Sequence, residues 1–169
     1  PDFRAGETVF QLLTQTSGRA GRRKKQGKVL IQTRLDEHPV LKYVKTHDYK
    51  SYYQWEINNR QELSYPPFSR LGLIRFRART EQRAIAASQS CRNTITPVKG
   101  IDILGPAPCP ITRIKNYYRY HIIFRSRKQR DRNGHRMRHT IREAVQRFRQ
   151  TKEAEYVKLA IDIDPVDLL

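Results

Sequence analysis

Acidic residues, cysteines and long apolar runs are all scarce in this sequence. Its 169 residues include 16 Asp and Glu against 34 Lys and Arg, so the formal net charge at pH 7 is +18. No run approaches the roughly 18 apolar residues that a membrane-spanning helix needs, and no charged start with a following apolar stretch marks a secretory signal. We therefore expect no membrane partner and a cytoplasmic location. An organelle stays open, because a lost N-terminus would remove a transit peptide.

The two cysteines, Cys91 and Cys109, are too few for a disulfide framework or a four-ligand zinc site. His135 and His139 stand four residues apart, yet no third ligand is spaced to join them, so we expect no metal site in this segment. The low cysteine count favours a reducing compartment. The chain begins with Pro1 rather than Met, and we expect it to be a piece of a longer protein.

The excess of positive charge is the first indication of function. A surplus of +18 repels itself unless an anionic partner neutralises it. Nucleic acid is the commonest such partner, because every phosphate that a cation neutralises releases a counterion. The charge therefore predicts nucleic-acid contact, while a merely soluble basic surface is the alternative.

Residues 1–37 have the pattern of the end of an α/β domain. Apolar side chains at helical spacing predict a helix over residues 7–16, which Gly18 would end. A turn rich in Gly and Arg follows. The contiguous apolar run in residues 28–33 is then typical of a strand buried on both faces of a parallel sheet.

Residues 38–66 have the pattern of a helical connector. Helices are predicted over residues 40–46 and 48–63, the second with Asp48 as its N-cap. Two successive prolines after Tyr65 break any helix, so a domain boundary is predicted there.

Residues 67–169 alternate between strands and helices. The patterns predict strands over 70–79, 101–104 with 111–114, 117–126 and 156–164, and helices over 81–95 and 134–150. If the two stretches around G-P-A-P-C-P form one interrupted strand, the order is β-α-β-β-α-β. The fold class is then α+β: a ferredoxin-like split βαβ domain, with two helices on one face of a four-stranded antiparallel sheet. Its open sheet face or its basic helix surfaces would be free for a partner.

The sharpest local motif is Q-T-S-G-R-A-G-R at residues 15–22. Arg19 and Arg22 stand three apart, so their guanidinium groups can point the same way and match phosphate oxygens. Gly18 and Gly21 let the backbone turn and approach a ligand closely. An arginine placed on a transferring γ-phosphate stabilises the transition state. A basic surface turn, or one that grips DNA phosphates, is the alternative.

This motif resembles motif VI of the superfamily 2 helicases, whose general form is Q-x-x-G-R-x-x-R. Further segments resemble, in order, the C-terminal part of the primosomal replication-restart helicases, the PriA (primosomal protein N′) family. They are D-F-R-A-G-E, G-K-V-L-I-Q-T, L-S-Y-P-P-F, I-L-G-P-A-P, Y-Y-R-Y-H-I-I-F and I-D-I-D-P-V. The resemblance covers essentially the whole chain.

The resemblance implies an ATP-dependent helicase that unwinds DNA 3′ to 5′ at stalled or branched forks. It also implies forked and single-stranded DNA, single-strand-binding protein and primosome components as partners, in the bacterial cytoplasm. Residues 1–37 would end the second RecA-like lobe, with motif VI facing ATP. Residues 67–169 would be the DNA-binding C-terminal domain.

The same resemblance assigns the motif residues. Arg22 matches the arginine finger and Arg19 the arginine beside it, while Gln15 and Gly18 match nucleotide-binding positions. The family motif usually reads Q-V-A-G-R-A-G-R, so a Thr and a Ser replace two apolar residues here. ATP and Mg²⁺ would bind mainly outside this segment, and so would the zinc of the family. We therefore expect this fragment alone not to hydrolyse ATP.

Residues 113–120 interleave cations with aromatic rings, as in grooves where cations take phosphates and rings stack on bases. Tyr118 and Tyr120 share a strand face with apolar residues and are expected in the core. The candidate DNA contacts are Lys115, Asn116, Tyr117 and Arg119. A β-hairpin with aromatic cross-strand pairs is the alternative, and the basic face of helix 134–150 is a further candidate for phosphate contact.

A second function from a different class stays open. The chain could be a stand-alone basic ferredoxin-like module that binds RNA or the ribosome without catalysis. The strand predicted over residues 28–33 argues against it, since such a strand needs a larger sheet beside it. A Walker A motif and clustered cysteine pairs in the upstream reading frame would favour the helicase.

Overall fold

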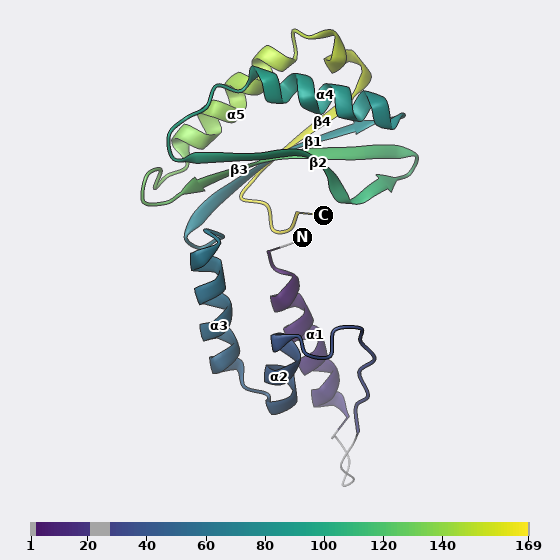
Figure 1. Cartoon of the computed structure of the whole chain (residues 1–169), viewed down its shortest axis with the longest axis vertical. Helices are drawn as coiled ribbons and strands as arrows, with labels where there is room; N and C mark the ends of the chain where they lie inside the picture. Colours follow the sequence, from purple (N-terminus) through teal and green to yellow (C-terminus); the bar gives the residue numbers. More distant parts are fainter. Residues whose placement is uncertain (1–2, 21–27, 169) are drawn as a thin grey trace. The chain divides into compact units, whose positions relative to one another are not determined.

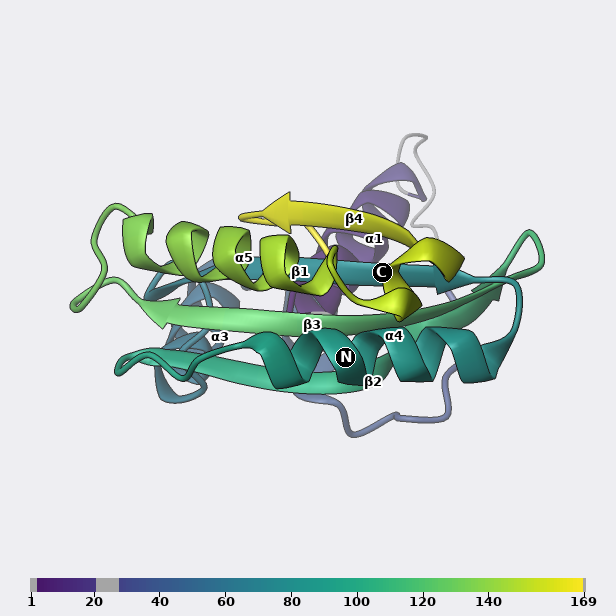
Figure 2. The same ribbon diagram turned by 90° about the horizontal axis from the view of Figure 1, so that it is seen from above.

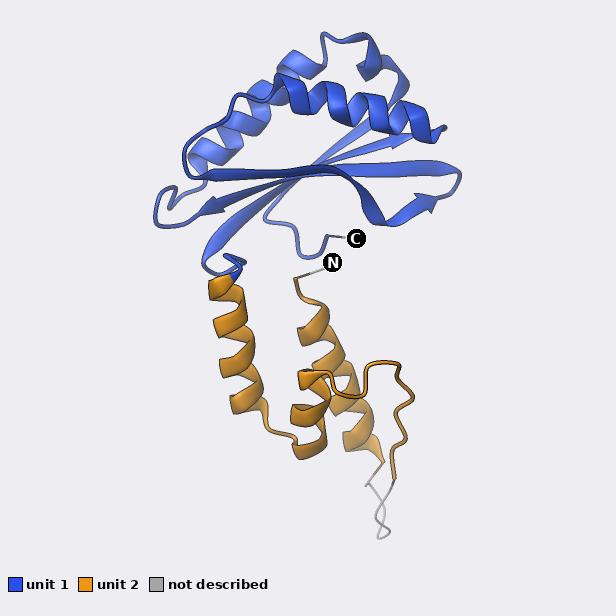
Figure 3. Ribbon diagram, in the orientation of Figure 1, with its two compact units in different colours: residues 1, 63–169 blue, residues 2–62 orange. Residues whose placement is uncertain are grey.

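The computed structural model describes residues 3–20 and 28–168 and divides the chain into two compact units. Unit 2 covers residues 2–62, and unit 1 covers residue 1 and residues 63–169 (Figure 3). The division lies a few residues before the prolines at which a boundary was predicted. The other predicted boundary, after residue 37, falls inside unit 2.

The described part of unit 2 is helical. Its elements are α1 (Ala5–Arg19), α2 (Pro39–Thr46) and α3 (Tyr49–Glu62) (Figure 1). Asp48 caps α3 as predicted, because its Oδ1 accepts a hydrogen bond from the Ser51 N–H at 3.0 Å. The three predicted helices are thus confirmed, but α1 is longer than expected and Gly18 lies inside its last turn.

A small, mostly aromatic core joins these helices. Phe10 of α1 stacks on Tyr52 of α3, with ring centroids 4.3 Å apart and planes 4° apart. Val40 and Val44 of α2 pack into the same cluster. Phe10 is the one residue of α1 that is fully buried among the described residues, so α1 contributes little to this core.

The strand predicted over residues 28–33 is wrong. The segment has no regular secondary structure, and Leu30 is 97% exposed. A strand needs a neighbour whose backbone groups pair with its own, and the described residues of unit 2 offer only helices. An apolar run without a sheet beside it therefore forms no strand.

Unit 1 is an antiparallel sheet with α4 and α5 on one face (Figures 1 and 2). Its elements are β1 (Ser69–Ala78), α4 (Glu81–Thr94), β2 (Ile101–Ile114), β3 (Tyr117–Arg127), α5 (His135–Phe148), a 3₁₀ helix (Lys152–Tyr156) and β4 (Lys158–Ile163). The four strands are ordered β2-β3-β1-β4, and all neighbours are antiparallel. This is the ferredoxin-like split βαβ arrangement, so the predicted fold class is confirmed.

The main core of unit 1 lies between the sheet and its helices. Ile74 and Phe76 of β1 and Phe124 of β3 are fully buried there with Phe148 of α5. Strand alternation predicts these faces correctly. The buried positions of α4 are Ala84, Ala87, Ser88 and Cys91. Ile85 is 44% exposed, because α4 packs on the sheet through these small side chains.

Strand β2 is interrupted where its prolines lie, as predicted. Its register against β3 shifts between Leu104 and Ala107, and again between Pro108 and Arg113. Prolines cannot donate to the ladder, so they collect at such irregularities.

The sheet face opposite the helices is not open, contrary to expectation. Leu71 and Leu73 of β1 are fully buried on this face, and so are Cys109 of β2 and Leu168 in the C-terminal segment. Leu71, Pro110 and Leu168 line one pocket there. No periodic pattern marks the irregular half of β2 or the last residues as a cover, which is why the sequence did not predict it.

Candidate nucleic-acid interface

The β2–β3 hairpin ends in a two-residue turn at Lys115 and Asn116. Both residues have positive φ angles, 47° and 60°, as the turns of tight hairpins require. Arg113 donates a hydrogen bond from Nη2 to the Asn116 Oδ1 at 3.2 Å across the turn. Strand β1 pairs with β3 only as far as Tyr118, so the tip extends past the end of β1.

Tyr117, the first residue of β3, lies beside two cations from other strands. The guanidinium carbon of Arg79 is 4.2 Å from its ring centroid, and the Lys158 Nζ is 5.2 Å away. Arg79 follows β1 and Lys158 begins β4. Because β1 is antiparallel to both β3 and β4, the end of β1 and the starts of β3 and β4 lie at the same end of the sheet. The strand topology therefore brings these three residues together.

More cations surround the same edge. Arg113 lies over the Tyr118 ring at 5.2 Å, and the exposed Arg77 stands in register with Lys158. The sequence holds no Asp or Glu between Asp102 and Asp131, so nothing on either strand of the hairpin tip neutralises this charge. Such an edge attracts phosphate, and its rings can stack on bases.

Arg119, a predicted DNA contact, is only 6% exposed. Its Nη1 donates a hydrogen bond to the Ile111 carbonyl at 3.2 Å. Burial, and then the charges of Arg75 and Arg119, lower the pKa of the adjacent His121 to about 4. The structure thus brings Lys115, Asn116 and Tyr117 together at the tip and places the Arg119 guanidinium inside the unit.

Sequence reasoning missed Arg79 and Lys158 as members of this cluster. Each lies at the end of a different strand, far from the hairpin along the chain. The predicted β-α-β-β-α-β order would have placed the end of β1 and the start of β4 at the same edge as Tyr117, so the signal was present in the topology.

Part of the basic face of α5 makes contacts within unit 1. Arg147 donates from Nη1 to the Thr96 Oγ1 at 2.9 Å and lies 3.8 Å from Glu143. Arg138 and Arg142 instead line an apolar groove of about 340 Å³. Ile141, Val145, Ile161 and Ile163 form its apolar part.

The motif residues Gln15, Gly18 and Arg19 are exposed on α1. The Thr16 hydroxyl donates to the Leu12 carbonyl at 2.8 Å, and the Ser17 hydroxyl to that of Thr14 at 2.9 Å, so α1 satisfies both substituted residues itself. Arg22 lies outside the described residues.

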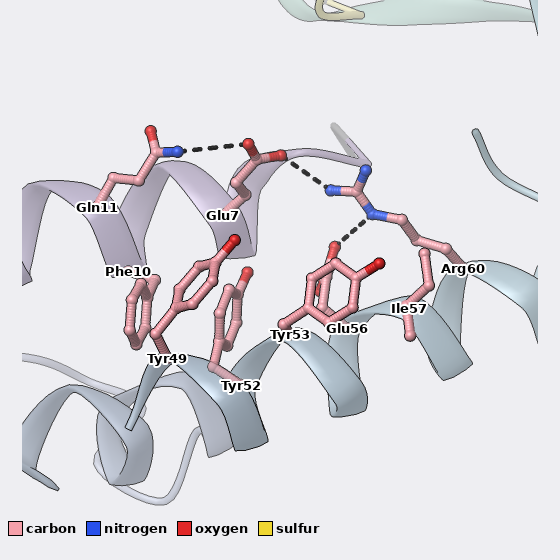
Figure 4. A pocket seen from close by; sticks show the side chains of 9 residues that line it. All are labelled: Glu7, Phe10, Gln11, Tyr49, Tyr52, Tyr53, Glu56, Ile57 and Arg60. Atoms are coloured by element: carbon pink, nitrogen blue, oxygen red, sulfur yellow. Dashed lines mark hydrogen bonds and ion pairs between the residues drawn. The ribbon is translucent and has the colours of Figure 1, made fainter. Parts of the chain in front are cut away.

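Unit 2 has a pocket of about 150 Å³ between α1 and α3 (Figure 4). The Arg60 guanidinium spans it, 2.7 Å from Glu56 and 3.1 Å from Glu7. The buried Tyr52 hydroxyl has no hydrogen-bond partner among the described residues, and burial raises its pKa. The Arg60–Glu7 ion pair joins α3 to α1, while the Arg60–Glu56 pair lies within α3.

Metal and thiol chemistry have little support in the described ranges 3–20 and 28–168. They contain no group of three or more His, Cys, Asp or Glu placed to hold a metal ion. Burial raises the pKa of Cys91 to about 12 and also raises that of Cys109, so both thiols stay protonated. In the same ranges, none of the helices has the length and apolarity to cross a bilayer.

The chain is similar to known proteins along its whole length. Residues 61–166 match the family model described as "Primosomal protein N C-terminal domain". "Replication restart protein PriA" of Bacillus subtilis (strain 168) is 36% identical over 167 residues, which is 98% of this chain and 20% of the relative. The proteins of the same name from a Synechocystis strain and from Haemophilus influenzae are 42% and 31% identical, over 72% and 99% of this chain and 15% and 22% of their own lengths.

The chain spans about a fifth of the length of these relatives. The family match covers unit 1 almost completely and the end of α3. This chain belongs to the PriA family and matches the C-terminal part of its members.

Proposed function

We propose that this chain is the C-terminal part of an ATP-dependent 3′–5′ DNA helicase. The helicase recognises stalled or branched replication forks and restarts replication by primosome assembly in the bacterial cytoplasm. Family membership supports a role in replication restart, because the relatives carry that function in their names. Its partners are forked and single-stranded DNA, single-strand-binding protein and other primosome components.

The observation that carries DNA binding is the cluster at the hairpin tip. Arg79 and Lys158 lie over the Tyr117 ring, with the exposed Lys115 and Asn116 beside it in the turn. The cations neutralise phosphates and release counterions, while the ring offers a face to bases. The sequence has no acidic residue between Asp102 and Asp131 to offset this charge at the tip.

The ATPase part of the proposal rests on the family motif. Gln15, Gly18 and Arg19 lie exposed on α1, so the nucleotide can reach them. When the intact protein binds ATP and Mg²⁺, Arg19 and Arg22 would contact the γ-phosphate and stabilise charge as the phosphoryl group transfers. Val9 and Leu12, three residues apart on α1, are 42% and 56% exposed, and this apolar pair supports a further lobe packed against α1.

The experiment that tests DNA binding is fluorescence anisotropy of the 169-residue chain over a salt series. Forked, single-stranded and duplex DNA serve as ligands. We expect the forked DNA to bind most tightly and all affinities to fall as salt rises. Lys115→Ala should lower the salt slope by about one, and Lys42→Ala, an exposed lysine of α2, is the matched control. Salt-independent affinity would contradict the proposal.

A further inference from the structure

The tip of the β2–β3 hairpin carries apolar side chains that phosphate binding does not explain. Ile114, directly before the turn, is 40% exposed, and Ile111 is 48% exposed. Single exposed apolar residues are ordinary. Two within the last four residues of β2, next to this basic turn, need an explanation, because an apolar side chain contributes nothing to a phosphate contact.

Ile114 stands next to the cation-bearing ring. It pairs in register with Tyr117 across the hairpin, and side chains of such a pair lie on the same face, about 4.5–5.5 Å apart at Cβ. That face also carries Arg79 and Lys158 over the Tyr117 ring. An apolar and aromatic surface is therefore flanked by groups that bind phosphates.

The surface that fits this arrangement is the exposed face of a base pair. Between two stacked pairs, an apolar wedge must first unstack them, which costs a few kcal/mol per step. Where a duplex opens into single strands, the last pair already exposes one face. A narrow two-residue turn can reach that face while the cations hold the flanking phosphates.

We propose that Ile114, beside Tyr117, packs against the terminal base pair where duplex and single strands meet. The hairpin thereby recognises the junction between duplex and single strands, and not the base sequence of the DNA. This inference rests on the proposed DNA-binding function and deepens it: it names the element of the fork that the tip contacts.

The test uses the 169-residue chain and a fork with 2-aminopurine in the terminal base pair. Anisotropy on the same samples reports binding, and a fork with the probe in the middle of the duplex reports positional specificity. Saturating protein should lower the fluorescence of the terminal probe only, because packing against the exposed face keeps the pair stacked and the probe quenched. Ile114→Ser should abolish this decrease and lower fork affinity about fivefold, as expected for a lost apolar contact. Affinity for closed circular duplex, which has no junction, should fall less.

Ile161→Ser is the matched control. Ile161 is 45% exposed, and it pairs with Ile74 partway along β4, away from the tip of the β2–β3 hairpin. This variant should keep the fluorescence decrease, and so should Ile114→Leu. A decrease that persists in Ile114→Ser, or saturated native complexes without a decrease, would overturn the inference. Absence of salt-dependent binding to any DNA would instead reject the proposed function.

Discussion

The Asp131 carboxylate accepts a hydrogen bond from the backbone N–H of Met137 at 3.0 Å and so caps α5. Its other oxygen accepts from the Arg136 N–H at 3.2 Å. The hydroxyl of Ser126 in β3 donates a third bond at 3.2 Å. Gly134, the N-cap residue by position, has no side chain to do this. One buried carboxylate therefore fixes the start of α5 to the end of β3.

We expect Asp131→Ala to destabilise unit 1 by about 2 kcal/mol, since it removes a cap and leaves buried donors without a partner. Urea unfolding followed by circular dichroism measures this loss. Asp162→Ala, an exposed acidic residue of β4, removes the same charge and should change stability by less than about 0.5 kcal/mol. Equal losses in the two variants would show that the cap contributes nothing.

His121 predicts how stability depends on pH. Burial, and then the charges of Arg75 and Arg119, lower its folded-state pKa to about 4, from an unfolded value of about 6.5. Between these values the unfolded chain binds a proton that the folded chain does not, so stability falls as pH drops from about 6.5 to 4. Thermal unfolding at a series of pH values measures the slope.

His121→Leu should flatten this slope, because the titrating group is gone. His139→Gln is the control, since His139 is exposed on α5 and its loss should leave the slope in place. A native midpoint that stays constant across the window would contradict the depressed pKa.

The strand pattern in unit 1 made the fold predictable. Ile74 and Phe76 alternate with residues of the other face, and the chain itself supplies each strand's neighbour. Residues 28–33 also form an apolar run, but the described residues of unit 2 offer no strand to pair with them. Local pattern predicts a strand correctly only where the partner strand is also present.

Side-chain contacts within unit 1 explain why the candidate site differs from the sequence prediction. Arg119 alternates with core residues in the sequence, so the pattern alone predicts that its side chain is available to DNA. The bend of β2 places the Ile111 carbonyl where this guanidinium can donate to it, which no periodicity encodes. Arg79 and Lys158 can be predicted as neighbours of Tyr117 only from the strand order, because contacts between strand ends depend on topology.

Arg119→Ala should lower stability rather than DNA affinity. The substitution leaves the Ile111 carbonyl without its donor, at a cost of about 1–3 kcal/mol. The salt slope of DNA binding should stay close to that of the native chain, because the guanidinium is 6% exposed. Urea unfolding and anisotropy together measure both effects. A reduced salt slope with unchanged stability would place Arg119 in the interface after all.

Tyr117 should contribute to DNA affinity through its aromatic ring. Tyr117→Phe keeps the surface over which Arg79 and Lys158 lie, while Tyr117→Ala removes it. Loss of one stacked base costs about 1–3 kcal/mol, so we expect Tyr117→Ala to weaken binding of single-stranded DNA about tenfold. Tyr53→Ala, a 53% exposed tyrosine of α3, is the control. If Tyr117→Phe weakens binding as much as Tyr117→Ala, the hydroxyl and not the ring makes the contact.

The proposed role of Arg22 is tested in the intact protein, because the resemblance places the rest of the ATP site outside this segment. An arginine on the transferring phosphoryl group is worth about 10³–10⁵ in rate. Arg22→Ala should therefore reduce DNA-stimulated ATP hydrolysis by at least about a thousandfold, while DNA binding without nucleotide persists. Arg34→Ala, an exposed arginine that follows the motif, controls for loss of a positive charge. Because the finger acts only in the transition state, ATP affinity should change far less than turnover. Native turnover in Arg22→Ala would remove this residue from the catalytic site.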